Sequence, residues 1–540
     1  MNVKQLKDLA NTLYSKKKPI DSLWQELAEN FYVERAEFTI QRSIGNDFAS
    51  NLMTSYPMLC RRDLGNQFST MLRPTAKPWF HIGRLYSKDD DNESRQFLQK
   101  FEVIQRRAMY DPDACFTRAT KEGDHDFAAF GQCAISTEVY KNPKTGPHLL
   151  YRCWHLRDMV WMENETGKIG TIFRKWKAPA IVLSRLFKDK VHEKVKEKLN
   201  KAPFDEINTM HMIVESDMYD DDARGRPFWS IWYDVEHDHL MEAVPVWTKY
   251  YTIPRWQTVS NSQYSYSPAT VAALPDARLL QAMTYTLLEA GEKATNPPLI
   301  AVQDAVRSDV STFAGGLTWI DYEYDEKTGE ALRPIAQDFR GFNFGMEMNQ
   351  NSQGMIREAF FLNTLKMPQR APEMTAYEVW QRVQEYIRGA LPIFEPMEME
   401  YNAELCNQTF ELLMRNLAFG SPLDWPKELL GQGIEFTFES PLHDAIDSQK
   451  GQTFTQAQQL LAAAVAIDPT VSSLPKVEVA LRDALNGIGV PASWLNSEDY
   501  VAQAKQQQAE QQQQQDLLNK MEQGSNVVKN IGGVQQPMAA

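Results

Sequence analysis

The residues best suited to chemistry lie in a short segment near position 370. Lys366 and Arg370 are cations. Residues 367–374 contain two prolines, which stiffen the segment. A turn that serves only to pack two helices would favour a shorter, glycine-containing sequence without exposed cations. The pattern therefore indicates a functional loop, with a purely structural turn as the alternative.

A helix start follows this loop directly. Thr375 and Glu378 have the spacing of a capping box, in which the threonine hydroxyl accepts from the Glu378 amide and the carboxylate reaches back to the Thr375 amide. The helix is expected to run to about Phe419 and to bend at 389–392, where glycine and proline interrupt it. The loop is thus predicted to lie between two long helices.

A possible metal site involves two alternating histidines. His237 and His239 would share one face of a strand, with Asp234 and Glu242 close by. The favoured alternative is a polar hairpin turn within residues 229–250. We therefore assign no metal.

A basic stretch covers residues 174–201, with ten lysines and arginines against three acids. Contact with nucleic acid is one interpretation. Apolar residues recur there every four positions, from Leu183 to Leu199, so a solvated face of one amphipathic helix is favoured. A glutamine-rich tract at 503–515 could form either an assembly coil or a frayed helix.

Catalytic motifs are absent from the sequence. It contains no G-x-x-x-x-G-K-[ST] phosphate loop and no G-x-S-x-G elbow. His192-Glu193 matches the start of the zinc-protease motif H-E-x-x-H, but position 196 is a lysine instead of the second histidine. We therefore expect no enzyme and no cofactor, although carboxylates such as those at 220–222 leave a hydrolase as a weak alternative.

Composition bounds the class of protein. The chain has 540 residues, 43% of them hydrophobic, and a net charge of −14 from 57 basic and 71 acidic side chains. These values indicate a globular protein of several units that does not grip nucleic acid over a broad face. Five scattered cysteines without a C-x-x-C pair favour a reducing compartment. No signal peptide or membrane span is evident, so a soluble, cytoplasmically made protein is expected.

The periodicity of apolar residues predicts the order of elements. The expected sequence is helices to about 130, antiparallel strands at 132–255 with one helix near 180–200, a long helix from Pro275 to Pro297, a compact insert at 298–345, a second long helix at 347–366, the helix from Thr375, a strand at 434–438, helices at 444–522 and a disordered end.

This order resembles one known family, the portal or head-to-tail connector proteins of short-tailed double-stranded DNA bacteriophages. The resemblance covers nearly the whole chain and is carried by the following segments: Leu64–Leu72, Pro78–Phe80, Phe127–Gly131, the helix–insert–helix of 276–366, Thr375–Glu378 and Gly451–Ile467.

The resemblance implies an α+β, mainly helical fold with wing, stem, clip and crown, assembled as a cyclic ring around a central channel. The implied divisions are a wing at 1–270, a stem helix at 271–296, a clip at 297–346, a second stem helix at 347–366, a tunnel loop at 367–374, a kinked wing helix and strand at 375–440, a helical crown at 441–522 and a disordered tail at 523–540.

It further implies a role in genome packaging and ejection. About twelve copies would surround double-stranded DNA, which Lys366, Gln369 and Arg370 would contact without sequence specificity. The implied partners are the terminase large subunit, the major capsid and scaffolding proteins and the tail or adaptor proteins, with no membrane insertion. The expected location is a capsid vertex of the virion, after assembly in the host cytoplasm. A virion-associated hydrolase and an adaptor or scaffold that binds the ring remain alternatives.

Overall fold

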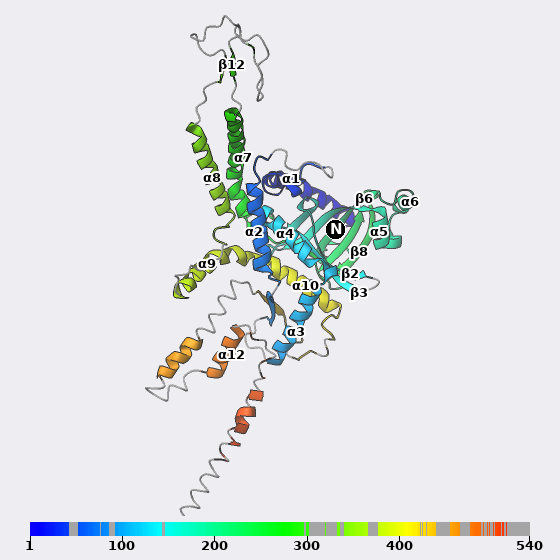
Figure 1. Ribbon diagram of the computed structural model, residues 1–540. Coiled ribbons are helices and arrows are strands. Elements are labelled where there is room, and N and C mark those ends of the chain that lie inside the picture. Colours follow the sequence, from blue (N-terminus) through cyan, green and yellow to red (C-terminus); the bar gives the residue numbers. More distant parts are fainter. Residues whose placement is uncertain are drawn as a thin grey trace, which may run out of the picture. The chain divides into compact units, whose positions relative to one another are not determined.

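A computed structural model describes most of the chain (Figure 1). The described residues are 1–42, 52–75, 77–85, 92–142, 146–295, 299–301, 319, 332–334, 340–365, 376–421, 423, 425–427, 429–438, 454–464, 476–487, 490, 494, 496, 500–501, 503–508, 510–511, 513 and 515. They fall into two compact units, residues 1–73 with 110–412 and residues 74–109 with 413–540.

The first unit contains a five-stranded antiparallel sheet in the order β4-β5-β6-β7-β8. Each strand pairs with the next one along the chain, as expected from short Val-, Ile- and Trp-rich runs separated by turns. The predicted antiparallel strands are therefore confirmed. Their bounds are Met159–Glu163 (β4), Ile169–Pro179 (β5), Glu206–Glu215 (β6), Phe228–Asp234 (β7) and His239–Val246 (β8).

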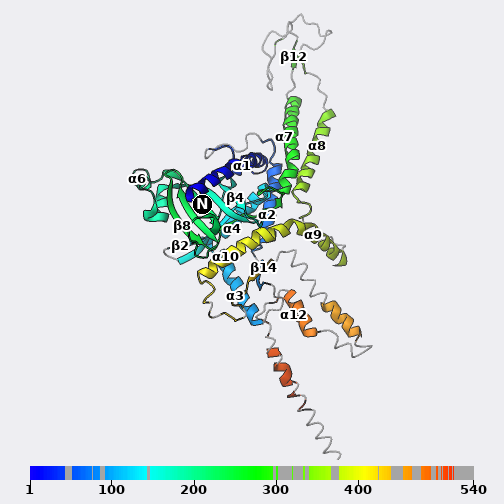
Figure 2. The ribbon, with the colours of Figure 1, turned by 180° about the vertical axis from the view of Figure 1, so that it is seen from behind.

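Helices cover both faces of this sheet (Figures 1 and 2). The N-terminal helix α1 (Val3–Phe31) buries Leu6 and Leu13 against Phe173 and other apolar residues of one face. Helices α5 (Ala180–Phe187) and α6 (Glu193–Lys201) lie on the other face, as part of a second core cluster. Because apolar side chains are buried on both faces, the sheet is held between helix α1 on one side and helices α5 and α6 on the other.

The predicted single helix near 180–200 is wrong in one respect. The chain forms two helices there, α5 and α6, separated by a short 3-10 turn. Lys188 has φ 49° in the left-handed region, which an α-helix cannot accommodate. His192 then caps α6 by accepting from the Lys194 amide at 3.3 Å.

The remaining elements before residue 268 pack around a smaller sheet, β3-β2-β9. Phe127, Phe68 and Trp256 form an aromatic cluster beside it, with Phe127 and Trp256 stacked at 5.6 Å. The bounds are Tyr56–Leu72 (α2), Phe116–Phe130 (α4), Ile135–Asn142 (β2), Gly146–Cys153 (β3), Tyr251–Thr252 (β9), Gln257–Thr258 (β10) and Ser265–Tyr266 (β11).

The first long helix, α7, spans Pro268–Thr295 and so begins earlier than predicted. Its start is set by Ser267, whose hydroxyl oxygen accepts from the Thr270 amide at 3.4 Å. Pro268 occupies the first helical position, where its missing N–H is no loss. Pro275, which the sequence pattern favoured as the start, lies inside the helix.

The second long helix, α8, spans Arg340–Ala359, seven residues earlier at its start than predicted. Between the two helices the described residues include the antiparallel strands β12 (Leu299–Ala301) and β13 (Leu332–Pro334). The expected strand and turns of the insert near 315–320 and 327–329 otherwise lie outside the described residues.

The next helix, α9, spans Ala376–Met397 and passes through 389–392 in α geometry. A π-helical segment (η7) at Glu398–Asn402, which the sequence pattern did not indicate, follows α9. Helix α10 (Ala403–Arg415) follows. The extra residue per turn in η7 shifts the faces that α9 and α10 present relative to each other.

The second unit is built on the antiparallel pair β1 (Phe80–Arg84) and β14 (Ile434–Phe438). Trp79 and Phe438 stack at 6.3 Å, and Phe101 of α3 (Asn92–Met109) packs on Phe419 at 4.6 Å. The strand predicted at 434–438 is confirmed. In the C-terminal region the described helices cover 454–464, Val477–Gly487 (α12) and 503–508.

All five cysteines lie among the described residues and are free thiols. Among the described helices, none has the length and apolar character needed to cross a lipid bilayer.

Candidate functional site: the paired helices α7 and α8

Helices α7 and α8 lie side by side and run antiparallel (Figures 1 and 2). The Asn349 side-chain amide donates to the Thr284 hydroxyl at 3.2 Å. One turn further along α7, Leu287 lies against Gly345 of α8, and a Cβ at position 345 would be 3.0 Å from the Leu287 Cδ2. The missing side chain at Gly345 therefore lets the two backbones approach closely.

The inner half of α7 is anchored in the first unit. The Ser267 and Thr270 hydroxyls donate to the carbonyls of Ala128 and Ala129 at the end of α4, at 2.8 and 2.7 Å. Gln281 accepts from the Met53 amide at 2.8 Å. The buried residues of α7 end at Leu280. Up to this point the helix is part of a packed core.

The outer halves of the pair expose apolar side chains instead. On α7, Leu288 is 55% exposed and Tyr285 is exposed to a similar degree. On α8, Phe344 is 68% exposed, and Met346 is also exposed. Two adjacent helices that present large apolar side chains outward form a surface that a protein partner could cover.

Two cations of α7 have acidic partners. Arg278 forms an ion pair with Glu26 of α1, with its Nε 2.8 Å from the carboxylate. Lys293 pairs with Glu289 one turn earlier at 2.6 Å.

The segment that follows α8 contacts the middle of α9. The Tyr386 hydroxyl of α9 donates to the carbonyl of Leu365 at 3.4 Å, and Gly389 lies against Thr364. The predicted loop residues Lys366, Gln369 and Arg370 and the cap residue Thr375 lie outside the described residues. Glu378 lies in α9, where only its helical backbone is described. The loop and cap therefore stay predictions.

Comparison with known proteins decides the class of the chain. Residues 3–495 match the family model described as bacteriophage head to tail connecting protein. The chain belongs to this family. Two relatives are a "Probable portal protein" of Bordetella phage BPP-1, 22% identical over 95% of this chain and 92% of its own, and a "Portal protein" of Salmonella phage epsilon15, 20% identical over 82% and 79%.

Membership confirms the resemblance drawn from the sequence and favours it over the hydrolase and adaptor alternatives. A head-to-tail connecting protein is a component of the virion at the junction of head and tail. Its partners therefore include capsid and tail proteins. The match spans both compact units, so it applies to the protein as a whole.

Elsewhere in this connector, a buried ion pair joins α2, α4 and η7. The guanidinium of Arg73 pairs with Asp124 and donates to the Asn402 side chain at 2.7 Å. It also lies over the ring of Tyr401, 4.5 Å from its centroid. Asn402 donates in turn to the carbonyl of Leu72 at 3.3 Å. Sequence reasoning missed this cluster because its members are up to 329 positions apart.

The histidines singled out in the sequence have ordinary partners. The Nδ1 of His237 lies 2.7 Å from the Asp234 carboxylate, and the Nε2 of His239 lies 2.9 Å from the Lys190 carbonyl. Glu242 pairs with the Lys190 ammonium at 2.7 Å. The hairpin between β7 and β8 is confirmed. His192 stacks on His237 at 5.0 Å, a contact that the sequence pattern did not indicate.

The basic stretch at 174–201 does not form one solvated helix face, because it begins in β5 and continues through α5 and α6. Arg174 is buried, and its guanidinium lies 3.6 Å from the centre of the Trp154 ring. Lys198 pairs with Glu236 at 3.2 Å. Lys175 lies over the Tyr14 ring at 3.6 Å. Several cations of this stretch are thus committed to contacts within the connector.

Proposed function

We propose that this chain assembles into a closed ring, expected to contain twelve copies, whose axial channel conducts double-stranded DNA during packaging and ejection. Family membership and the names of two relatives support a portal function. The observation on which the ring depends is the α7–α8 pair, whose inner part is anchored and whose outer part exposes apolar residues.

The α7–α8 pair would form the stem of this ring. Side chains such as Leu288 and Phe344 are exposed in one chain and would be covered by the pair of the next copy. A contact between one patch and a different patch on the neighbouring copy is heterologous. Such contacts close into a ring when the rotation from each copy to the next adds up to a full turn. Burying one such side chain contributes about 1.5–3 kcal/mol per interface.

Charge supports passage of DNA without adhesion. Residues 276–366 contain eight basic and thirteen acidic side chains, a net charge of −5. Twelve copies at −14 each would give the ring about −168. Each phosphate that a protein cation neutralises adds salt-dependent affinity, which would slow a sliding duplex. A stem with few available cations therefore suits fast, sequence-independent movement.

The loop at 367–374 would supply the few positive contacts. Lys366, Gln369 and Arg370 would meet the phosphate backbone, which carries no sequence information. The contact between Tyr386 and Leu365 supports this assignment only at one end of the loop, because it holds the residue before Lys366 against α9. The capping box of Thr375 and Glu378 would set the direction in which the loop leaves α9.

The remaining divisions follow the family pattern. We assign the segment between α7 and α8, residues 296–339, to a clip that meets the terminase motor and later the tail, because the structure begins α8 at Arg340. We assign residues 441–522 to a crown. Residues 1–270 and 375–440 would form the wing. The phosphate loop of an ATPase is absent from the sequence, so the energy for packaging would come from the terminase. The ring would occupy one capsid vertex after assembly in the host cytoplasm.

Electron microscopy of the purified full-length protein tests the proposal. The expected result is a ring with a central hole. Viewed along their axis, all rings should show the same rotational symmetry. A monodisperse monomer at high protein concentration would contradict ring formation. The number of copies per virion distinguishes a portal from the adaptor alternative. A portal is present as one ring per particle.

A further inference from the structure

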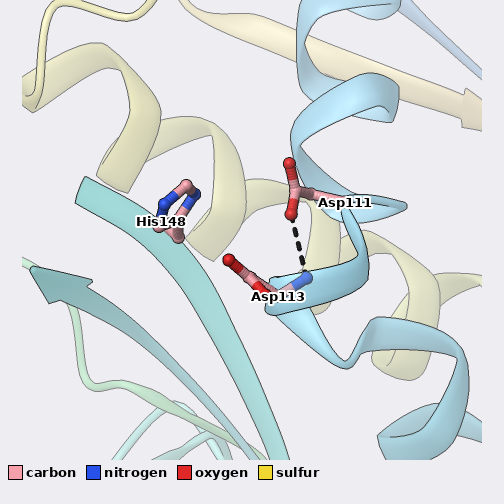
Figure 3. A group of neighbouring side chains, drawn as sticks. All are labelled: Asp111, Asp113 and His148. Atoms are coloured by element: carbon pink, nitrogen blue, oxygen red, sulfur yellow. Dashed lines mark hydrogen bonds between the residues drawn. The ribbon is translucent and has the colours of Figure 1, made fainter. Parts of the chain in front are cut away.

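We infer that Asp111, Asp113 and His148 form a binding site for a first-row divalent metal ion of the zinc type. One ligand atom from each residue lies within 4.8 Å of the other two. Figure 3 shows the two carboxylates and the imidazole directed toward a common space. The site is independent of the proposed channel function.

The donors come from two distant segments. Asp111 and Asp113 flank Pro112 at the start of the 3-10 turn η2 (Pro112–Ala114), and His148 is the third residue of strand β3. A cluster of acids from one loop is common on protein surfaces. A histidine brought from a strand more than thirty residues away adds a nitrogen donor, which is what distinguishes a transition-metal site from a solvated acidic turn.

The surrounding structure holds the two segments together without a metal. The Tyr151 ring of β3 packs on Phe116 at 5.0 Å, and Phe116 packs on Tyr110 at 5.2 Å. The Tyr151 hydroxyl also lies 2.7 Å from the Thr409 hydroxyl. Because these aromatic groups fix β3 beside η2, the donor set is largely pre-organised and needs only small side-chain rotations to close on an ion.

The geometry of the carboxylates suits coordination. One oxygen of Asp111 accepts from the Asp113 amide at 2.9 Å, which orients its carboxylate. With metal–ligand distances of about 2.0–2.2 Å, neighbouring ligand atoms lie about 3–4 Å apart. Asp113 is exposed and Asp111 and His148 are half-buried, so an ion can enter from solvent.

The donor set selects the ion. Two carboxylates neutralise the charge of a divalent cation, and a neutral imidazole adds a donor that Zn²⁺ and Co²⁺ accept readily. Mg²⁺ and Ca²⁺ prefer shells made of oxygen alone. Three protein ligands leave at least one position of a tetrahedral shell for water. A bound ion would join β3 to η2 and stabilise the folded chain.

The test uses full-length protein stripped of metal with a chelator, then titrated with Zn²⁺ by calorimetry and with Co²⁺ by visible absorption. We expect one ion per chain, a raised melting temperature, and no displacement by excess Mg²⁺. His148→Gln and Asp113→Asn should each weaken Zn²⁺ binding at least about tenfold.

His239→Gln is the matched control, since it removes a histidine from the other histidine cluster of the chain. It should leave Zn²⁺ binding unchanged. Loss of binding in His239→Gln alone would overturn the assignment, as would wild-type protein that binds no Zn²⁺ at one equivalent. Melting of the metal-free variants shows whether each one folds. If both variants unfold, the Co²⁺ spectrum of the wild type decides: a spectrum identical to that of aqueous Co²⁺ overturns the site.

Discussion

Leu287 of α7 packs directly against the backbone of Gly345 in α8, where an added Cβ would lie 3.0 Å from the leucine Cδ2. The contact sets how closely the two helices approach, because the opposing surface at this point is a glycine. Thr284 and Asn349 form a hydrogen bond one turn away. Together these contacts fix the register of the helical pair that we assign to the stem.

Gly345→Leu should therefore separate the two helices. Overpacking a filled contact costs about 1–3 kcal/mol, and we expect a lower melting temperature and fewer complete rings. Differential scanning calorimetry and electron microscopy measure the two effects. Gly354→Leu in the same helix is the matched control, because a Cβ there meets nothing within 4 Å. Equal behaviour of the two variants would remove Gly345 from the packing argument.

Leu288→Asp tests the exposed surface of the pair. If a neighbouring copy covers this side chain, the change removes about 1.5–3 kcal/mol of burial from every interface, or roughly tenfold or more in the association constant. We expect the ring fraction to fall in mass photometry while the monomer stays folded. Leu186→Asp on α5 is the control, since Leu186 is 52% exposed against 55% for Leu288. Rings that survive Leu288→Asp unchanged would exclude this face from the interface.

Much of the fold could be predicted from local patterns. The strands between 132 and 255 were evident because each is a short β-branched and aromatic run, ended by a turn such as the one at Gly167. The start of α7 was placed too late because Pro275 outweighed Ser267 in the pattern. A proline within a helix costs one hydrogen bond, which the buried residues on both sides of Pro275 can offset.

The candidate sites were harder to predict. The cations near position 370 stand out in the sequence because they accompany prolines and a capping box. No local pattern brings His148 to Asp111, or Arg73 to Asp124, since these pairs depend on the packing of separate elements. The sequence can single out a candidate carried by one segment, such as this loop, but it cannot reveal a cluster assembled from several segments.

The buried pair of Arg73 and Asp124 should be essential for folding. Arg73→Met leaves the Asp124 carboxylate in the core without its partner, and breaking a buried pair in this way costs about 3–5 kcal/mol. We expect a large fall in melting temperature or an insoluble protein. Lys293→Met, which removes an exposed ion pair on α7, is the control and should melt like the wild type. A stable Arg73→Met protein would show that the pair is dispensable.

Glu398 of η7 should make stability depend on pH. Burial, assisted by the nearby Glu395, raises the pKa of Glu398 from 4.5 to about 7. The folded chain then binds a proton that the unfolded chain has released between pH 4.5 and 7, so this group lowers stability as pH rises through that window. The loss is complete above pH 7. Because Glu398 is partly exposed, we expect a cost of about 1–2 kcal/mol there.

Glu398→Gln should remove this dependence and stabilise the protein at pH 8 more than at pH 5. Urea unfolding at both values measures the difference between variant and wild type, which cancels the contributions of other titrating groups. Glu347→Gln, an exposed carboxyl on α8, is the control. An equal effect of Glu398→Gln at pH 5 and pH 8 would contradict the raised pKa.

Arg370→Glu tests the loop that we assign to the channel. Reversing this charge in twelve copies would replace attraction for the phosphate backbone with repulsion at the narrow part of the channel, so DNA should be packaged less completely. Rings should still form, because the loop lies outside the helical pair. Packaged genome length in complementation assays, with ring formation checked by microscopy, measures the effect. Arg185→Glu, the same charge change at an exposed site on α5, is the control and should package normally. Full-length genomes in Arg370→Glu particles would remove this loop from the packaging mechanism while leaving the ring itself intact.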